Sequence, residues 1–290
     1  MKSNLSKNYI CRVCRSNKTT YLGDLPMQRQ FAGKDLKQLI KKSSFYKCNS
    51  CLLLLRHPIL SVADYNKLYK IAESTVWNNH SSELRQDQLI VKNMILTKRP
   101  NGCKVLDIGC YTGFLLDSLS DKYTKFGIEM SDRASSVATK KNITIIGSDL
   151  YNINTEEKFD LILSVDVIEH TENPHAFLER LVGLLNDGGE IIISTGNVDN
   201  WLWKYLKNRF WYCKFYEHIS FIGTKWVEKY CTQNNMILTN QVTFNYSKFR
   251  FKSIVKNLVG LILSLLKIKP EQYSHITSDH FCFSIKIKAN

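Results

Sequence analysis

The fold is decided by the stretch Lys104-Val105-Leu106-Asp107-Ile108-Gly109-Cys110-Tyr111-Thr112-Gly113. A short apolar run leads to a loop bracketed by Gly109 and Gly113, and the apolar segment 114–119 follows. This pattern predicts a buried strand, a tight turn and the start of a helix, the arrangement by which doubly wound α/β folds place a ligand at a helix N-terminus. Neither glycine has a Cβ, so the backbone can approach a ligand closely.

The loop lacks the signatures of the common nucleotide-phosphate sites. The dinucleotide fingerprint Gly-x-Gly-x-x-Gly needs glycine where this chain has Tyr111 and Phe114. The chain also lacks the Gly-Lys-Ser/Thr sequence that holds nucleotide phosphates at this place. We therefore expect a ligand with a ribose and an adenine but no phosphate chain.

Further short apolar segments predict the other parallel strands, at residues 125–129, 143–149, 159–164 and 189–195. Glu129 ends the first of them, about 20 residues after Gly109, the spacing at which such folds place a carboxylate on ribose hydroxyls. Asp149 ends the next strand, and Asp166 follows the strand after that. Ligands of open α/β sheets bind at the carboxyl ends of the strands, so all these acids should line one crevice.

The ordered segments resemble those of class I S-adenosylmethionine-dependent methyltransferases. The resemblance covers about residues 81–195 and rests on 105–113, 127–129, 148–149, 166–170 and the turn 187–189 before the fifth strand. It departs from the family at Tyr111, where glycine is usual. The resemblance implies S-adenosylmethionine as cofactor, bound by Asp107, Gly109, Cys110, Gly113, Glu129, Asp149 and Asp166.

Two Cys-x-x-Cys knuckles near the N-terminus predict a zinc site. Four thiolates can surround Zn²⁺ tetrahedrally, and a metal supplies folding free energy to a segment with few large apolar clusters. With all four positions filled by protein, the zinc should be structural rather than catalytic. The predicted ligands are Cys11, Cys14, Cys48 and Cys51.

These features together predict the fold class and the domain organisation. We expect an α/β protein with a doubly wound, mostly parallel seven-stranded sheet and a small N-terminal zinc ribbon. The predicted divisions are a ribbon at 1–60, a linker helix at 61–80, a cofactor-binding core at 81–200, and a segment at 201–290 with an aromatic cap, the final sheet strands and a basic apolar helix. The aromatic cap is residues 201–216, which suit stacking on a base or sugar, insertion at a membrane interface, or burial on the core.

A zinc domain joined to this core resembles the sugar-modifying methyltransferases, including the C-methyltransferases of nucleotide-linked sugars. In that group a Tyr-x-Glu-His segment lies beside the reacting carbon, whereas here Phe215 precedes Glu217 and His218 at the tyrosine position. Because the tyrosine is absent, we favour methylation of a hydroxyl over methylation of a carbon. The resemblance implies catalytic roles for His218 first, His170 second, and Glu217. A tyrosine of the linker helix, Tyr65 or Tyr69, is a further candidate for substrate contact, with core packing as the alternative.

The charge of the chain is unevenly distributed. The formal net charge of +14 divides into +12 for residues 1–103, −7 for 104–198 and +9 for 199–290. Basic flanks favour an anionic partner, such as a nucleotide-linked or glycan acceptor, although solvated lysine-rich faces explain them equally well. The start of the chain has no apolar run, and we expect a cytoplasmic protein whose nine cysteines stay reduced.

Residues 250–270 carry lysines on both sides of an apolar run that is too short to span a bilayer. A buried helix is the default interpretation of this segment. The alternative is a helix in the membrane interface, which would attach the protein peripherally at the inner membrane face. That alternative would suit a lipid-linked glycan acceptor.

Three functional hypotheses follow. The favoured one is a methyltransferase that acts on a nucleotide sugar or a cell-surface polysaccharide intermediate. The second is an RNA-modifying methyltransferase that uses the zinc ribbon and the basic flanks, but the Asn/Asp-Pro-Pro-Tyr/Phe signature of amino-group methylation is absent after the fourth strand, so we do not expect a nucleic-acid partner. The third is a non-catalytic module that binds the cofactor. The sequence leaves open the acceptor, the atom methylated and the oligomeric state.

Overall fold

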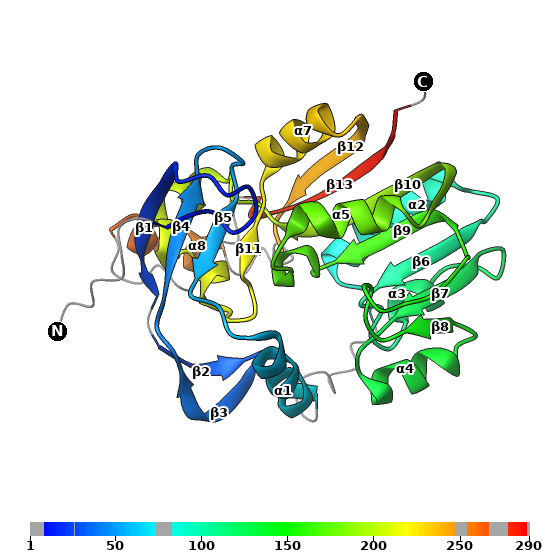
Figure 1. Ribbon diagram of the computed structural model, residues 1–290, viewed down its shortest axis with the longest axis horizontal. Coiled ribbons are helices and arrows are strands. Elements are labelled where there is room, and N and C mark those ends of the chain that lie inside the picture. Colours follow the sequence, from blue (N-terminus) through cyan, green and yellow to red (C-terminus); the bar gives the residue numbers. More distant parts are fainter. Residues whose placement is uncertain (1–8, 26, 74–82, 247–253, 267–277, 289–290) are drawn as a thin grey trace.

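The computed structural model describes residues 9–25, 27–73, 83–246, 254–266 and 278–288. Its centre is a seven-stranded sheet with the order β12-β13-β10-β9-β6-β7-β8 (Figure 1). β13 is antiparallel to both of its neighbours, and the strands from β10 to β8 are parallel. The strands are β6 (Lys104–Ile108), β7 (Thr124–Ile128), β8 (Thr144–Gly147), β9 (Phe159–Val165), β10 (Leu185–Gly196), β12 (Met236–Phe244) and β13 (His280–Ile287). The predicted fold class is confirmed.

Helices cover both faces of this sheet. Successive side chains of a strand point to opposite faces, and accordingly Ile191 and Ile193 belong to one buried cluster while Ile192 belongs to another. The first cluster includes side chains of α5 (Pro174–Val182) and α7 (Thr224–Gln233), and the second includes side chains of α2 (Gln86–Lys98) and α3 (Phe114–Asp117). The helix α4 (Asp132–Thr139) joins β7 to β8 and buries Ala138 in the second cluster.

The boundaries of α5 differ from our prediction. We expected a helix from residue 176 to 185 that ends at the turn 187–189. The helix begins earlier because the side chain of Asn173 accepts hydrogen bonds from the amides of His175 and Ala176, which caps its first turn. It ends at Val182, and β10 already starts at Leu185, with an irregular register before Glu190.

The N-terminal ribbon is a four-stranded sheet with the order β1-β4-β5-β11, beside a hairpin of β2 (Gln28–Phe31) and β3 (Lys34–Ile40). Three strands come from the ribbon itself: β1 (Thr19–Leu25), β4 (Ser43–Cys48) and β5 (Leu54–His57). The fourth, β11 (Ser220–Phe221), comes from the C-terminal third of the chain and pairs antiparallel with β5. The ribbon is thus completed by a strand that lies far from it in sequence, and our boundary at residue 60 stays a prediction.

The linker helix is α1 (Val62–Glu73), and residues 74–80 of its predicted range lie outside the described residues. The aromatic segment 201–216 forms α6 (Trp201–Leu206) and two 3-10 turns, Lys207–Arg209 and Trp211–Lys214. Most of its large side chains are buried, which favours burial on the core. The exceptions are Trp201, Tyr205 and Phe215, which are exposed.

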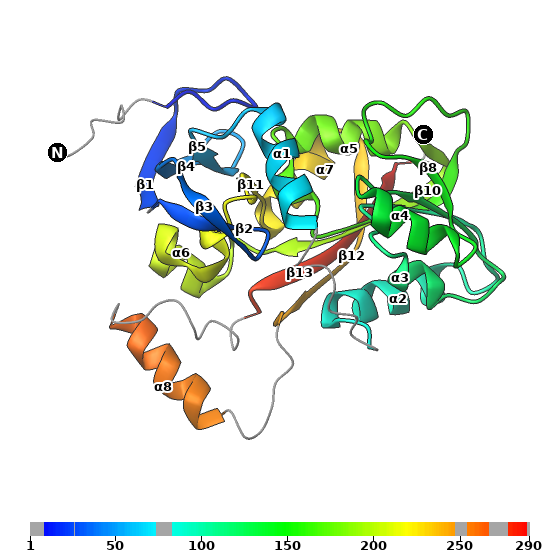
Figure 2. The same ribbon diagram turned by 90° about the horizontal axis from the view of Figure 1, so that it is seen from below.

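The last helix, α8 (Ile254–Leu265), lies between β12 and β13 in sequence, and Figure 2 shows it standing out from the packed layers. Residues 250–253 and 267–270 of the segment discussed above lie outside the described residues. Within the part of the chain that the structure describes, no helix has the length and apolar character needed to cross a membrane.

Candidate functional site

The loop after β6 adopts the tight geometry that its glycines predict. Gly109 and Gly113 have φ angles of 72° and 71°, in the left-handed region that favours glycine. Tyr111 also has a positive φ of 50°, so the position where the resembling family has glycine keeps the left-handed backbone despite its side chain. A Cβ added at Gly113 would lie 2.2 Å from Cδ1 of Ile143, so the turn also needs glycine for packing.

The carboxylate of Glu129, directly after β7, lies beside this loop. Its Oε2 accepts a hydrogen bond from the amide of Tyr111, and its Oε1 accepts one from the amide of Ser131, both at 2.8 Å. Glu129 therefore stands where the sequence predicted a ribose-binding acid.

The side chain of Cys110 packs inside the protein, and the predicted role of this residue in cofactor binding stays a prediction. It is buried, and a Cβ added at Gly127 would lie 2.4 Å from its Sγ. Within the loop its thiol lies 3.8 Å from the carbonyl oxygen of Tyr111, and its amide donates to the carbonyl of Ile128 at 3.1 Å.

Two acids, the buried Asp107 and the half-buried Asp166, lie at the carboxyl ends of β6 and β9. Burial raises the pKa of Asp107 to about 8, with the charge of Glu129 as a second cause. Burial and the nearby Asp87 raise the pKa of Asp166 to about 8, against the opposing effect of Arg85. Within the described residues, Oδ1 of Asp166 is buried without a hydrogen-bond partner. Acids with raised pKa values and an unpartnered oxygen are suited to receive a cationic ligand.

Arg85, which we did not predict from the sequence, forms salt bridges with Asp87 and Asp166. Its Nη2 lies 2.6 Å from Asp87 and 2.9 Å from Asp166. Asp166 itself has a positive φ of 54°, the kind of unusual backbone that clusters at functional sites. Arg85 belongs to no recognisable sequence motif, and its partner Asp166 is 81 residues away in sequence. No sequence pattern could have found this pair.

Asp149 lies at the edge of the predicted crevice and is exposed. Its Oδ1 accepts from the amide of Tyr151 at 3.0 Å, and its Oδ2 accepts from the side-chain amide of Asn152 at 2.7 Å. The carboxylate thus shapes the turn after β8, and its predicted contact with the adenine stays a prediction.

The two histidines predicted from sequence come together. The rings of His170 and His218 are perpendicular, with centroids 4.9 Å apart. The hydroxyl of Tyr69 lies 2.9 Å from Nδ1 of His170. Of the two linker-helix tyrosines, Tyr69 therefore reaches the histidines, whereas Tyr65 is buried and packs near Phe31.

His218 is held in one tautomer. Its Nδ1 lies 3.2 Å from the carbonyl oxygen of Tyr212, and because a carbonyl can only accept, Nδ1 carries the proton. The other ring nitrogen, Nε2, then keeps its lone pair while the ring is neutral. Burial, with the adjacent His170 as a second cause, lowers the pKa of His218 well below its usual value. His218 is therefore neutral at pH 7.

Glu169 and Glu217 flank the histidines in different ways. Glu169 is buried, and its carboxylate accepts one hydrogen bond on each oxygen, from the hydroxyls of Tyr212 and Thr195. Glu217 is also buried, and its Oε2 has no hydrogen-bond partner among the described residues. Glu217 is thus the better placed of the two to bind an acceptor.

The ring of Tyr216 lies away from this cluster. The guanidinium carbon of Arg56 is 4.8 Å from its centroid, so Tyr216 packs under a buried arginine of the ribbon. Phe215 occupies the position where the sugar C-methyltransferase pattern has its tyrosine. Hydroxyl rather than carbon methylation stays a prediction.

Two arginines of the ribbon support the backbone around the histidines. Arg56 is fully buried and donates to the carbonyls of His218, Cys213 and Phe215 at 2.7 to 2.9 Å. Arg12 lies inside the first cysteine knuckle, and its guanidinium donates to four acceptors. These are the carbonyl oxygens of Glu172, Arg56 and Ile219 and the hydroxyl of Ser220. The ribbon is therefore part of the framework of the site.

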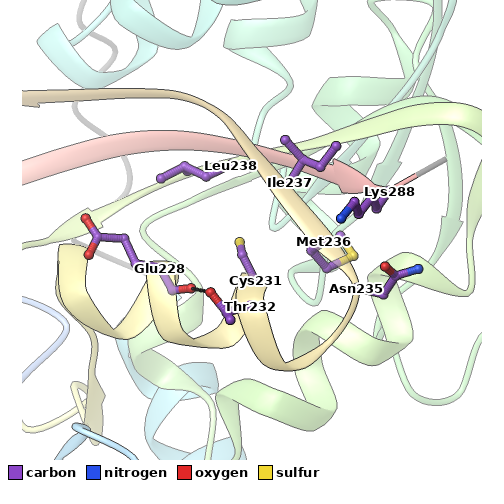
Figure 3. A pocket seen from close by; sticks show the side chains of 8 residues that line it. All are labelled: Glu228, Cys231, Thr232, Asn235, Met236, Ile237, Leu238 and Lys288. Carbon is purple, nitrogen blue, oxygen red and sulfur yellow. Dashed lines mark hydrogen bonds between the residues drawn. The ribbon is translucent and has the colours of Figure 1, made fainter. Parts of the chain in front are cut away.

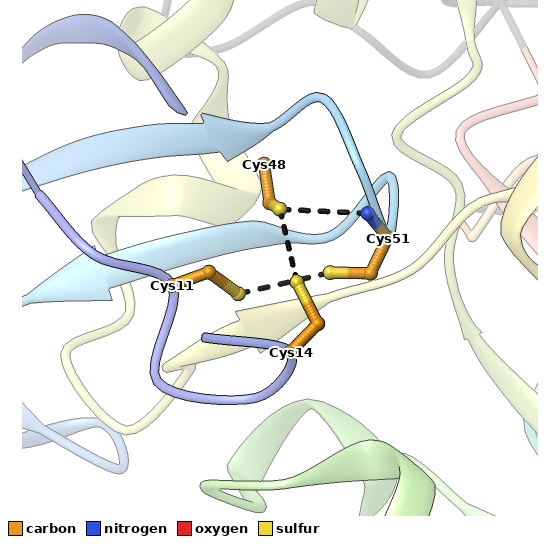
Figure 4. Close-up of side chains that lie close together, drawn as sticks. All are labelled: Cys11, Cys14, Cys48 and Cys51. Carbon is orange, nitrogen blue, oxygen red and sulfur yellow. Dashed lines mark hydrogen bonds between the residues drawn. The ribbon is translucent and has the colours of Figure 1, made fainter. Parts of the chain in front are cut away.

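The four predicted zinc ligands form one cluster (Figure 4). Sγ of Cys11 lies 3.7 Å from Sγ of Cys51, and Sγ of Cys14 lies 3.5 Å from Sγ of Cys48. Zn–S bonds of about 2.3 Å at tetrahedral angles place sulfur atoms about 3.8 Å apart. The donor set and its spacing fit Zn²⁺. His57, the last residue of β5, packs against the ring of Tyr9 at a centroid distance of 4.8 Å and is not part of the cluster.

A second group of possible metal ligands consists of Glu169, His170 and His218. Their ligand atoms lie within 4.8 Å of one another. We interpret this group as an acid–base cluster, in which Glu169 accepts hydrogen bonds from Tyr212 and Thr195.

A hollow of about 490 Å³ between α7 and β12 is a separate feature (Figure 3). Its lining includes Cys231, Met236 and Lys288. β12 runs parallel to β10, because both are antiparallel to β13, and Met236 is its first residue. The hollow therefore lies toward the amino ends of the parallel strands, at the opposite edge from the acids and histidines.

Comparisons with known proteins agree with this geometry. The model of the methyltransferase domain family matches residues 83–237. A mitochondrial ubiquinone biosynthesis O-methyltransferase of Dictyostelium discoideum is 33% identical over 38% of this chain and 42% of its own length. A ubiquinone biosynthesis O-methyltransferase of a Bradyrhizobium species is 26% identical over 51% of this chain and 64% of its own length. The matches thus span less than two thirds of these relatives. Their names do not support our prediction of a role in polysaccharide biosynthesis.

Solved structures share the fold. The N-methyltransferase NodS of Bradyrhizobium japonicum in complex with S-adenosyl-L-homocysteine has a TM-score of 0.52 at 15% identity, over 76% of this chain and 98% of NodS. The plantazolicin methyltransferase BpumL, in complex with a substrate analogue and the same product, has a TM-score of 0.50 at 21% identity, over 77% of this chain and 92% of BpumL. The family model covers more than half of the chain, and the sheet has the expected order, so this chain belongs to the methyltransferase domain family and has the class I S-adenosylmethionine-dependent fold.

Proposed function

We propose that this protein transfers a methyl group from S-adenosylmethionine to a hydroxyl of a sugar, in a nucleotide sugar or a cell-surface polysaccharide intermediate. The observation that carries the proposal is the environment of His218. Its Nδ1 faces the carbonyl of Tyr212, and its ring lies beside His170, so Nε2 keeps a lone pair. A hydroxyl nucleophile needs a base of this kind, whereas a carbon nucleophile was expected to use the tyrosine that Phe215 replaces.

The residues at the carboxyl edge of the sheet fit the cofactor. When bound, S-adenosylmethionine supplies a methyl group that its positively charged sulfur has already activated. Glu129, which lies directly after β7 beside the glycine loop, is the proposed acceptor for the ribose hydroxyls, and the loop from Gly109 to Gly113 lets the backbone approach. Asp107 and Asp166 supply negative charge for the cationic ligand, which the unpartnered Oδ1 of Asp166 supports.

His218 is the proposed general base. Because its pKa lies well below the usual value, the ring is neutral at pH 7, and Nε2 can accept the proton of the acceptor hydroxyl. Proton removal by a positioned base contributes roughly 10²–10⁴ to a rate, and alignment of the reacting atoms contributes further. His170, whose Nδ1 contacts the hydroxyl of Tyr69, is the second candidate.

Glu217 is the proposed acceptor-binding residue. A buried carboxylate oxygen without a partner is costly unless a ligand donates to it. A sugar offers several hydroxyl donors, so it can satisfy Glu217 and still present one hydroxyl to the base. This requirement favours a hydroxyl-rich acceptor.

The phenolic hydroxyl of a ring compound is the second candidate acceptor, and the names of the relatives favour it. An RNA acceptor is not favoured, because Arg12 and Arg56 of the ribbon donate to carbonyl groups of the protein itself. A cytoplasmic location stays a prediction, and one relative is named as mitochondrial.

A transfer assay with isotope-labelled S-adenosylmethionine tests these proposals. The purified, zinc-loaded protein is incubated with a panel of nucleotide sugars, a panel of catechol-type ring acceptors, and RNA. We expect label in a sugar methyl ether, and we expect Glu217→Gln to raise KM for that sugar more than it lowers kcat. Label confined to the ring acceptors or to RNA would refute the sugar proposal. Cofactor binding without transfer to any acceptor would refute the enzymatic one.

A further inference from the structure

The helix α8 exposes an apolar face. Leu258, Ile262 and Leu265 recur at intervals of four and three residues, so they lie along one side of the helix. All three are exposed, as are Val259 and Leu266, with Ile262 at 50% and Leu266 at 62%. The default interpretation of a buried helix is therefore wrong for this face. Figure 2 shows α8 apart from both faces of the central sheet.

Two aromatic side chains of α6 extend this surface. The hydroxyl of Tyr205 donates to the carbonyl oxygen of Leu265 at 2.8 Å, which places α6 beside the C-terminal end of α8. Trp201 is four residues before Tyr205 and lies on the same side of α6, and its side chain is 53% exposed. The opposite side of α6 buries Trp203 in the core of the ribbon region.

The sequence on both sides of α8 is basic, and this charge indicates the partner. Between Glu228 and Glu271 the chain has no Asp or Glu, and it has seven basic residues: Lys229, Lys248, Arg250, Lys252, Lys256, Lys267 and Lys269. A second copy of the chain docked on the same face would bring like charges together. A bilayer with anionic headgroups is complementary to them and also accepts the apolar side chains.

We propose that α8, together with Trp201 and Tyr205 of α6, is a membrane-docking face that lies in the interface of an anionic bilayer. The helix has 12 residues, which suits a position in the interface plane rather than a span. Indole and phenol rings prefer the same depth, where an apolar body and a polar edge are both accommodated. This inference concerns where the protein works and holds for either acceptor class.

The test is co-sedimentation of the full-length, zinc-loaded protein with vesicles. One set contains phosphatidylcholine alone, and the other contains an equal mixture of phosphatidylcholine and phosphatidylglycerol. We expect binding to the anionic vesicles, a decrease at high salt, and partitioning on the order of tenfold weaker for Ile262→Asp. The matched control is Val62→Asp on α1, an apolar residue that is 62% exposed and gains the same charge, and it should bind like the wild type.

Thermal melting and cofactor affinity establish that each variant is folded, since Ile262 contacts neither the cofactor loop nor the histidines. Anionic-vesicle binding that is equal for the wild type and Ile262→Asp would overturn the proposal. So would light scattering that shows a dimer which Ile262→Asp dissociates, without vesicle binding by either protein. In that case the face would be an interface between two copies of this chain.

Discussion

Replacement of Arg12 by Met tests whether the cysteine knuckle organises the acceptor site. The guanidinium donates to the carbonyl oxygens of Glu172, Arg56 and Ile219 at 2.7 to 2.9 Å, and to the hydroxyl of Ser220 at 2.8 Å. Glu172 is two residues after His170, and Ile219 directly follows His218. Methionine keeps a long unbranched side chain but has no donor, so both histidine segments lose a shared support.

The expected decrease in kcat/KM follows from these contacts. Hydrogen bonds from a charged group contribute about 1.5–3 kcal/mol each, but water can replace the donor at this half-buried position. We therefore count a net loss equal to about one such bond. If that loss falls on the aligned state of the histidines, kcat/KM for the acceptor should decrease about tenfold to hundredfold.

The assay separates the two substrates. Acceptor kcat/KM is measured at saturating S-adenosylmethionine, and cofactor affinity is measured by calorimetry. The proposed cofactor contacts at Glu129 do not involve the knuckle, so the affinity should be unchanged. The control is Arg15→Met, which removes the same charge from an exposed side chain close to the same knuckle. An unchanged acceptor kcat/KM in Arg12→Met, or an equal loss in cofactor affinity, would refute the reasoning.

Four further predictions address the base, the cofactor, pH and the metal. His218→Asn should lower kcat by roughly 10²–10⁴ with unchanged cofactor affinity, and a kcat close to the wild type would remove it as the base. Glu129→Ala should weaken cofactor binding by about 1.5–3 kcal/mol in calorimetry, and equal affinity would contradict its ribose contact. The pKa values of Asp107 and Asp166, raised to about 8, mean that a cationic ligand displaces protons. Cofactor affinity should therefore rise as the pH rises through about 8, with proton release visible in buffers of different ionisation heat, and a flat profile would oppose this. Since each folded-state pKa is raised above its unfolded value, the cofactor-free protein should lose stability as pH rises toward 8. Elemental analysis should find about one zinc per chain, and Cys14→Ser should lower both zinc content and Tm; equal zinc in the variant would exclude the site.

The fold could be predicted because its signals are local. The run before Gly109 and the apolar segments after it each have the length of a buried strand, and a glycine loop between a strand and a helix identifies the ligand edge. The cysteine spacing inside each knuckle is local as well. Element ends were less well predicted, as at α5, where Asn173 starts the helix two residues before the predicted position.

The acceptor site could be predicted only in part. His170 and His218 were named because they lie in recognisable segments, and the structure brings their rings together. Tyr69 reaches His170 across 101 residues of sequence, and Arg12 reaches Ile219 across 207. No periodicity records contacts of this kind, because they depend on how whole elements pack.

The sequence by itself determined the sheet, the ligand edge and the pair of knuckles, since strand length, glycine conformation and thiolate spacing are properties of short segments. Only the tertiary structure decided that β11 completes the ribbon, that ribbon arginines support the histidine backbone, and that α8 keeps its apolar face exposed. The physical reason is that hydrogen bonding and burial between distant segments are settled by the packing of the complete chain, where each group must find a partner or meet the solvent.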